Sequence, residues 1–375
     1  MLSTAKWKSE IPNATMVYAL STVTASSRQD RAHLYVIANR SRMRHYISGL
    51  WGLDLRFLAR ILLHMARLLR CRKRCSRKIQ DFAPDVIVVI RAFPEGLFAR
   101  WCHVKRFVLR TAGSDISYFT KIPFLGHIIR STLRRASYII TQSEPEKKYL
   151  QQELGVRCPI GITNIGVDTA MFKPTDCSNR AKYGLCQNTV VVVSNRYLGG
   201  VYNGFAIIEA FLLAKKRCSN LELLYISPSP IKQAMRNKIE SISLGVDGIH
   251  IVEGPIPHEE MAQALGCGDI WASLSSVDGV PNSLLEAMSC GLVPIVGELQ
   301  PLREWVQHGY TGFLVPPQDV AAMADMMVKL GESKVLLKEL SHRCRQKICQ
   351  DGSYEKNMRN MMDMALAARN SPGHR

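Results

Sequence analysis

SVDGVPNSLLEAMSCGLVPIVG (276–297) is the stretch of this sequence that decides the fold. The residues before it, 269–275, have the pattern of a buried strand, a short helix is expected over 284–288, and a second strand follows. Gly291 is suited to end the helix, because glycine readily adopts the left-handed conformation of a C-cap. In an open α/β sheet, ligands bind at the carboxyl ends of strands. The loop 278–283 lies there with its amides at a helix N-terminus, an arrangement that suits a diphosphate.

The same alternation of strands and helices runs along the chain and predicts parallel sheets. In the N-terminal half the expected strands are 33–38, 85–91, 106–111 and 137–142. In the C-terminal half they are 189–194, 221–226, 249–252, 269–274, 293–296 and 313–315. Helical patterns close the chain at 319–331, 334–349 and 354–369. We therefore expect an α/β protein of two Rossmann-like halves that join near residues 166–174.

The composition is that of a protein with substantial cores. The chain has 375 residues, of which 47% are hydrophobic, enough for roughly two or three domains. Its eleven cysteines are odd in number and include no Cys-x-x-Cys pair, and no secretory signal peptide precedes them. We expect reduced thiols in a cytoplasmic compartment, and neither a disulfide framework nor a zinc site.

The net positive charge of the chain comes entirely from its N-terminal part. Residues 1–150 hold 27 Lys and Arg against 9 Asp and Glu, a net charge of +18, whereas residues 151–375 hold 22 against 22. This asymmetry suggests an anionic partner for the N-terminal half: a membrane surface, a nucleic acid or a polyanionic acceptor. Nucleic acid is the unlikely one of these, because the chain has no zinc-finger pattern, no convincing helix-turn-helix and no interleaving of aromatic and basic residues.

Much of this charge lies in residues 53–78, where arginines recur at helical spacing among apolar residues: Arg56, Arg60, Arg67 and Arg70. The segment is too charged to span a bilayer. It could lie on an anionic membrane with its apolar face down and its arginines among the head groups. It could equally be a domain helix that buries its apolar side against the N-terminal sheet and exposes a basic face to solvent. The pattern alone does not separate the two.

Four segments, in order along the chain, resemble the retaining glycosyltransferases of family 4. They are TNIGVDTAMFKP (163–174), VVVSNRYLGGVYNGFAIIEAF (191–211), the opening segment 276–297 and REWVQHGYTGFLVPPQD (303–319). The resemblance implies a GT-B architecture, in which two Rossmann-like domains face each other across a cleft. It implies an N-terminal acceptor-side domain over 1–166, a C-terminal nucleotide-sugar-binding domain over 167–352, and a helix within 353–375 that crosses back to the first domain.

The resemblance also implies the site residues. Arg196 would contact the donor diphosphate, Glu286 would hold the ribose hydroxyls, and Asp278 would lie beside the donor sugar; these three are the expected catalytic residues. A planar guanidinium suits a diphosphate, and a carboxylate can accept hydrogen bonds from two neighbouring hydroxyls. Further donor contacts are expected from Asn203, Gly254, Gly279, Val280, Pro281, Asn282 and Ser283.

Three features depart from the family pattern. The loop Gly199–Gly204 lacks the lysine that usually follows the arginine. In the segment that resembles the acceptor-side His-Gly-x-Asp turn, Ala112 stands in place of the histidine. Gly113 and Asp115 remain as acceptor-side candidates, although Asp115 fits a helix N-cap equally well. The family's N-terminal glycine loop is also missing, since residues 16–30 contain no glycine.

The implied activity is retaining transfer of one sugar from a nucleotide-sugar to a glycan or lipid-linked acceptor. We expect no cofactor and no metal, because no Asp-x-Asp pair or His and carboxylate cluster accompanies the donor segment, so that arginine, amides and a helix dipole would neutralise the diphosphate. The expected location is cytoplasmic, at the inner face of the membrane. The three departures leave a second hypothesis open: a degenerate family 4 scaffold that binds a nucleotide-sugar, a membrane or a partner without turnover.

Overall fold

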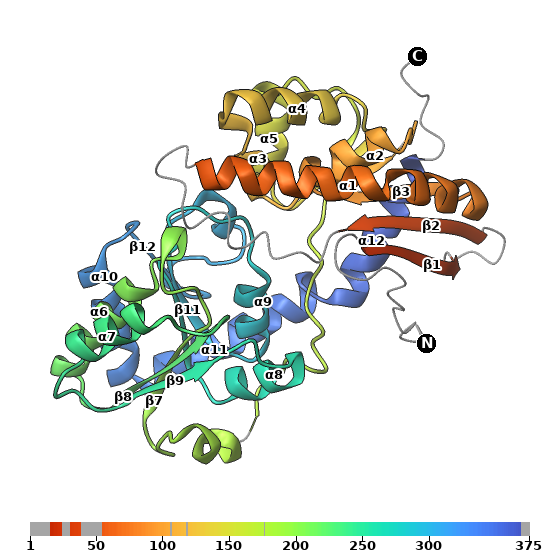
Figure 1. Cartoon of the computed structure of the whole chain (residues 1–375). Coiled ribbons are helices and arrows are strands. Elements are labelled where there is room, and N and C mark those ends of the chain that lie inside the picture. Colours follow the sequence, from red (N-terminus) through yellow and green to blue (C-terminus); the bar gives the residue numbers. More distant parts are fainter. Residues whose placement is uncertain are drawn as a thin grey trace. The chain divides into compact units, whose positions relative to one another are not determined.

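The computed structural model describes residues 16–24, 31–38, 55–105, 107–117, 119–175 and 177–368. The chain divides into two compact units, one formed by Met1–Asn164 with Arg359–Arg375 and the other by Ile165–Met358. Each contains a sheet with helices packed on it (Figure 1). The prediction of an α/β protein with two parallel sheets is confirmed. The predicted cleft and the predicted crossing of the last helix concern the placement of the two units, and they stay predictions.

The N-terminal unit contains a sheet whose strands follow one another in chain order, β1-β2-β3-β4-β5-β6. The strands are β1 (Met16–Thr24), β2 (Arg31–Ala38), β3 (Val86–Ile90), β4 (Val108–Arg110), β5 (Tyr138–Thr141) and β6 (Ile160–Ile162). All neighbours from β2 to β6 are parallel, whereas β1 is antiparallel to β2. The sequence patterns did not predict β1 or β6, and a consecutive order with an antiparallel edge differs from a Rossmann sheet.

The N-terminal core lies between the sheet and its connecting helices. These are α1 (Leu55–Phe82), α2 (Leu97–Trp101), α3 (Ser114–Ser117), α4 (Pro123–Leu133) and α5 (Glu144–Gln152). Right-handed crossovers between strands in consecutive order place the connecting helices on the same face of a sheet. Val89 and Leu109 of the strands accordingly share one apolar cluster with Phe98 and Ile129 of the helices.

Helix α1 resolves one of the alternatives left open by the sequence. Leu68 and Cys75 are buried in the N-terminal core, whereas Leu69 and Arg70 are exposed. For residues 65–82, the interpretation in which the apolar face enters a membrane is therefore wrong, because that face already packs on the domain. The side chains of Arg56, Arg60 and Arg67 lie outside the described residues. No helix in the described part of the chain is long and apolar enough to cross a bilayer.

The C-terminal unit contains a fully parallel sheet in the order β12-β11-β10-β7-β8-β9. The strands are β7 (Val190–Ser194), β8 (Leu221–Ser227), β9 (Ile249–Glu253), β10 (Ile270–Ser273), β11 (Val293–Gly297) and β12 (Phe313–Val315). All six match strands expected from the sequence. Buried runs such as Val190–Val193 are typical of a sheet that is covered on both faces.

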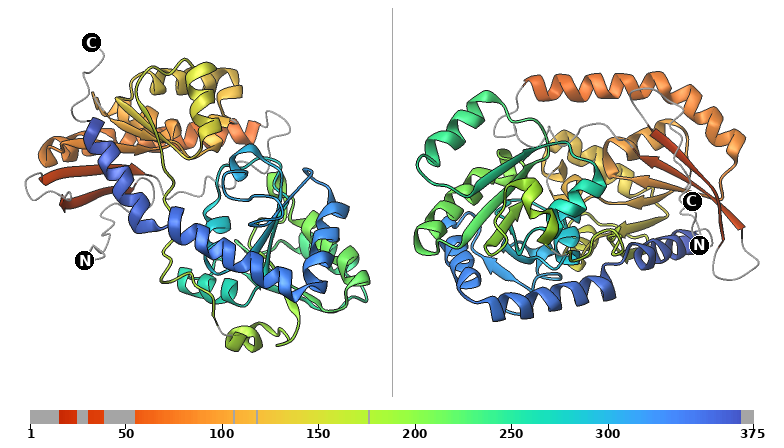
Figure 2. Two further views of the ribbon diagram at one scale, coloured as in Figure 1. Left: turned by 180° about the vertical axis from the view of Figure 1, so that it is seen from behind. Right: turned by 90° about the horizontal axis from the view of Figure 1, so that it is seen from below.

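Two apolar clusters show how this sheet is covered. Val190 and Val192 of β7 belong to one cluster, and Val191 and Val193 belong to the other, because alternate side chains of a strand point to opposite faces. The first face is covered by α6 (Gly204–Arg217), α7 (Gln233–Ile242) and α10 (Val320–Glu332), and the second by α8 (His258–Gly266) and α9 (Asn282–Ser289). Helix α11 (Lys334–Asp351) contributes to both clusters. Figure 2 shows the same helices and sheet from two further directions.

The last helix, α12 (Tyr354–Ala367), passes the boundary between the two units. Its part from Arg359 onward groups with the N-terminal unit. Within that unit, a side chain at Gly161 of β6 would meet the sulfur of Met364. Short helical turns complete the description at Ala92–Gly96, Phe119–Lys121, Cys177–Tyr183, Gly200–Tyr202 and Gln300–Leu302.

Candidate donor-binding site

The candidate site lies where the C-terminal sheet changes direction. From β7 the chain builds outward through β8 and β9 on one side and through β10, β11 and β12 on the other. The loops that follow β7 and β10 therefore diverge, and the carboxyl ends of such a pair of strands form the crevice in which doubly wound sheets bind ligands. Arg196 follows β7, and Asp278 lies between β10 and α9. The topology thus brings together two of the residues that the sequence predicted.

Arg196 is the centre of this site. Its side chain is only 7% exposed and forms an ion pair with Asp278 through Nη2. Nη1 donates a hydrogen bond to Ser283 Oγ at 3.1 Å, and Nη2 donates to Ser275 Oγ at 3.0 Å. The guanidinium also lies over the ring of Tyr202, 4.5 Å from its centroid. Hydroxyl groups and an aromatic face therefore hold a guanidinium cation, and Asp278 is its one ion-pair partner among the described residues.

One donor of this guanidinium remains unsatisfied, because Arg196 Nε is buried and has no hydrogen-bond partner among the residues that the structure describes. The backbone of Arg196 is nevertheless fixed, since Tyr225 donates its buried hydroxyl to the Arg196 carbonyl at 2.8 Å. Gly204 makes room for that hydroxyl: a Cβ at this position would lie 2.0 Å from Tyr225 Oη. The arginine is thus anchored through its main chain as well as through its side chain.

Helix α9 carries the second part of the site. Ser283 and Glu286 are one turn apart and share a face of this helix. Glu286 Oε1 lies 3.2 Å from Nε2 of His258, the first residue of α8. The His258 ring packs edge-on against Phe172, with ring centroids 4.8 Å apart. Hydrogen bonding to Glu286 raises the pKa of His258, so the pair favours an imidazolium beside a carboxylate.

Four of the predicted donor contacts, Gly279, Val280, Pro281 and Asn282, lie where the chain enters α9. The amide of Gly279 donates to Asp278 Oδ1 at 3.1 Å, and Val280 is buried. Pro281 precedes the helix and accepts a hydrogen bond from the Leu284 amide at 3.0 Å. Asn282, the first residue of the helix, is exposed. An exposed helix start beside a buried arginine suits a phosphate group, because unpaired amides and the positive end of the helix dipole lie there.

Two other predicted donor residues have structural partners. Asn203 is left-handed, with φ 50°, and its side-chain amide donates to the Leu274 carbonyl at 2.9 Å, which joins the loop after β7 to the end of β10. The amide of Gly254 donates to the Ser227 carbonyl at 2.7 Å, and a side chain there would lie 2.6 Å from that oxygen. Both residues shape the rim of the crevice, and their direct contact with a donor stays a prediction.

The acceptor-side candidates lie in the N-terminal unit. Gly113 is left-handed, with φ 84°. The carboxylate of Asp115 is buried and accepts from the amides of Ala92 at 2.7 Å and Ala112 at 2.9 Å, thereby tying together the loops after β3 and β4. Burial raises the pKa of this carboxyl. Asp115 is therefore a positioning residue for these loops, and its contact with an acceptor stays a prediction.

Three residues of the site were not predicted from the sequence: His258, Tyr202 and Ser275. Tyr202 lies in the loop that lacks the expected lysine, so an aromatic ring over Arg196 occurs where a second cation was sought. His258 follows the loop after β9, and only the packing of α8 beside α9 brings it to Glu286. Within the described ranges, no group of His, Cys, Asp or Glu side chains is arranged to hold a metal ion.

Comparison with known proteins gives a consistent result. The chain is 22% identical over 249 residues to N-acetyl-alpha-D-glucosaminyl L-malate synthase of Bacillus anthracis, a match that covers 65% of this chain and 63% of that protein. It is 26% identical over 285 residues to the amylovoran biosynthesis glycosyltransferase AmsK of Erwinia amylovora, covering 71% of this chain and 66% of that protein. The chain thus spans just under two thirds of the length of both relatives.

Solved structures show the same fold. Anabaena HepE in complex with UDP-glucose superposes with a TM-score of 0.68 at 15% identity, covering 84% of this chain and 90% of that chain. Sucrose-phosphate synthase from Thermosynechococcus elongatus gives a TM-score of 0.67 at 19% identity, with 80% and 78% covered. The model of the family described as "Glycosyl transferases group 1" matches residues 189–333, which include Arg196, Asp278 and Glu286. Residues 189–333 of the C-terminal unit thus match this family of glycosyltransferases, and the chain shares the fold of HepE and of sucrose-phosphate synthase.

Proposed function

We propose that this protein transfers a sugar, with retention of configuration, from a nucleotide-sugar to a glycan or lipid-linked acceptor. The observation that carries the proposal is the buried Arg196 at the switch point of the C-terminal sheet, held beside Asp278 and the start of α9. A leaving nucleoside diphosphate needs positive groups at this place. The family resemblance and the solved complex of HepE with UDP-glucose support the same donor class.

The diphosphate would exchange partners with Asp278. The ion pair leaves Arg196 electrically compensated before a donor binds, and Nε remains unsatisfied. Phosphate oxygens can take over the guanidinium with charge-assisted hydrogen bonds, and the exposed start of α9 supplies further donors. Asp278, released from Arg196, can then accept hydrogen bonds from hydroxyls of the donor sugar. The aspartate would thus hold the site in a ready geometry and orient the sugar.

Glu286 would bind the ribose of the nucleoside. Its carboxylate lies one helical turn beyond Ser283 and can accept hydrogen bonds from two adjacent ribose hydroxyls. His258 now occupies one of its oxygens, so nucleoside binding either displaces the imidazole or uses the other oxygen. Because Arg196 and the helix start supply the positive charge, we propose that the reaction needs no metal, and chelator should leave it unchanged.

The acceptor would meet the basic N-terminal half. The exposed basic residues described on α1 are Arg70, Lys73, Arg74 and Arg77. Since the apolar side of this part of α1 is buried in the domain, docking on an anionic membrane would be electrostatic only. Such docking at the cytoplasmic face would bring a lipid-linked acceptor to the enzyme. A contact of about 1 kcal/mol for each basic residue makes the docking reversible and dependent on salt.

A second candidate function is that of a scaffold that binds the donor without turnover. It is favoured by Ala112 in place of the histidine and by Tyr202 in the loop that lacks a lysine. Both hypotheses predict nucleotide binding, so only a turnover assay separates them.

The test is release of free nucleotide from a panel of UDP-, GDP- and ADP-sugars in the presence of a lipid-linked or membrane-extract acceptor. The proposal predicts acceptor-dependent release that is lost in Glu286→Gln and kept in the exposed control Glu332→Gln. Analysis of the product anomer tests retention. Tight nucleotide binding without release from any donor would establish the scaffold function instead.

A further inference from the structure

A cavity lies in the C-terminal unit at the edge of the sheet opposite the candidate donor site. Its volume is about 380 Å³, within the usual range for small-molecule sites. It is lined by residues at the amino ends of strands: Val190 at the start of β7, Asp269 before β10 and Gly291 before β11. The donor site described above lies at the carboxyl ends, so the two sites share no lining residue.

One wall of the cavity is rigid and internally neutralised. Arg180 is 3% exposed, and its Nη2 pairs with Asp269 Oδ2 at 2.7 Å. Its remaining donors bind backbone carbonyls, Nε at Cys267 and Nη1 at Cys186, Gln187 and Thr189. Asp269 also accepts from the Val191 amide at 2.8 Å. The side chains of this wall are therefore fixed by the protein itself, and the charges of Arg180 and Asp269 neutralise each other without a ligand.

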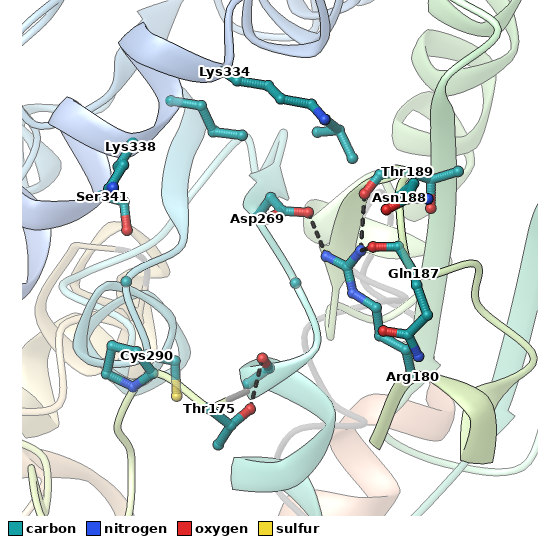
Figure 3. A pocket seen from close by; sticks show the side chains of 16 residues that line it. Thr175, Arg180, Gln187, Asn188, Thr189, Asp269, Cys290, Lys334, Lys338 and Ser341 are labelled. Atoms are coloured by element: carbon teal, nitrogen blue, oxygen red, sulfur yellow. Dashed lines mark hydrogen bonds and ion pairs between the residues drawn. The ribbon is translucent and has the colours of Figure 1, made fainter. Parts of the chain in front are cut away.

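The opposite wall carries two lysines. Lys334 and Lys338 of α11 both line the cavity, on the same face of the helix. Both are exposed, and neither forms an ion pair with any residue that the structure describes. Figure 3 shows these lysines and Ser341 on the side of the cavity that faces Arg180, Asn188 and Thr189. Three cations against one carboxylate give the lining a net positive charge.

The start of α11 adds to the positive potential in the cavity. Lys334 is the first residue of the helix, whose N-cap Ser333 accepts from the Leu336 amide at 3.3 Å. The first amides of a helix have no intrahelical acceptor, and the positive end of the helix dipole lies there. Lys334 is also close enough to Asp269 for its charge to oppose the effect of burial on the pKa of that carboxyl. The positive end of an 18-residue helix and two lysines, which form no ion pair within the described part of the chain, therefore meet at one cavity.

We propose that this cavity is a binding site for a small phosphate-bearing molecule, separate from the donor site. The phosphate would lie between Lys334, Lys338 and the first turn of α11. The rest of the ligand would face hydroxyl and amide side chains that can bond to a polyol, namely Thr175, Ser341, Gln187 and Asn188. Thr175 donates its hydroxyl hydrogen to the Gly266 carbonyl at 2.9 Å, so its oxygen can accept from a ligand hydroxyl.

The test is protection of lysines from acetylation, read by peptide mass spectrometry on the full chain. Ribose 5-phosphate is the probe and ribose its uncharged control. At about 10 mM, a ligand with a Kd near 1 mM occupies most of its sites. We expect slower acetylation of Lys334 and Lys338 with ribose 5-phosphate only. The exposed lysines Lys216 and Lys232 of the same unit should show no change.

A variant makes the test specific. In Lys334→Gln, the probe concentration that protects Lys338 should rise about tenfold through loss of one charge-assisted contact, whereas Lys216→Gln should leave it unchanged. Nucleoside diphosphate binding, which reports the donor site, should be the same in both variants and shows that they fold. No protection at either lysine, equal protection at all four, or equal protection by ribose would overturn the proposal. None of these outcomes bears on the glycosyl-transfer proposal, because its assay measures turnover at the donor site, at the other edge of the sheet.

Discussion

Glu95 makes the stability of the N-terminal unit depend on pH. It lies in the turn Ala92–Gly96 after β3 and is 1% exposed. Neither of its carboxylate oxygens has a hydrogen-bond partner in the described part of the chain. Arg91 Nη1 is 3.5 Å from Glu95 Oε1, and the charge of Asp115 contributes to raising the pKa of Glu95. Burial raises the pKa of Glu95 from its ordinary 4.5 to about 7, and Arg91 only partly offsets this effect.

The direction of the pH dependence follows from this raised pKa. The folded state holds the Glu95 proton more tightly than the unfolded state, so the stabilisation is complete below pH 4.5 and is lost as the pH rises to about 7. At about 1.4 kcal/mol for each pH unit between these two values, the loss is about 3 kcal/mol. Glu95→Gln cannot ionise, so its free energy of unfolding relative to wild type should increase by about that amount between pH 4.5 and pH 8.

Urea unfolding followed by hydrogen exchange of peptides from β3 and β4 measures this difference in the N-terminal unit alone. Asp115 and Glu146, whose pKa values burial also raises, are present in both proteins, and their effects largely cancel in the comparison. Glu153→Gln, at an exposed position of the same unit, is the matched control and should show no such trend. A difference between Glu95→Gln and wild type that stays constant from pH 4.5 to pH 8 would refute the reasoning.

Three further predictions concern the site, its packing and the basic helix. Glu286→Gln should lower the pKa of His258, which NMR titration measures directly; an unchanged pKa would mean that the two side chains do not pair in solution. Gly204→Ala should reduce the stability of the C-terminal unit by about 1 to 3 kcal/mol in thermal unfolding, because its Cβ would overlap Tyr225 Oη. Gly199→Ala meets only an ordinary contact at 3.5 Å, and an equal effect there would contradict the packing argument. Sedimentation with anionic vesicles should show binding that weakens with salt and falls on replacement of the exposed basic residues of α1 by Gln; binding to neutral vesicles of equal strength would exclude the electrostatic account.

The C-terminal sheet was predictable because its signals are local. A run of β-branched residues such as Val190–Val193 is typical of a strand buried on both faces, and the six expected strands are all present. Arg196 and Asp278 could be placed together because the carboxyl ends of parallel strands share one edge of a sheet. In the N-terminal sheet, β6 has three residues with glycine in the middle, so it has no strong pattern of its own.

The rest of the site depends on tertiary packing. His258 meets Glu286 only because α8 lies beside α9, and Tyr202 reaches Arg196 through a loop whose sequence differs from the family pattern. The two hypotheses for α1, a helix on a membrane and a helix of the domain, differ only in what the apolar face packs against, and helical periodicity does not reveal this. The burial of Leu68 and Cys75 shows that the face packs on the domain.

The central claim is that Arg196 neutralises a donor diphosphate, and calorimetric titration with matched ligands tests it most directly. Wild type, Arg196→Gln and the exposed control Arg303→Gln are each titrated with UDP, GDP or ADP, whichever binds, and with the corresponding nucleoside. Loss of a charged hydrogen bond worth about 1.5 to 3 kcal/mol should weaken the diphosphate about tenfold to a hundredfold in Arg196→Gln, with the nucleoside unchanged. Equal weakening of diphosphate and nucleoside, or no weakening of either, would contradict the account and make Arg196 a purely structural residue.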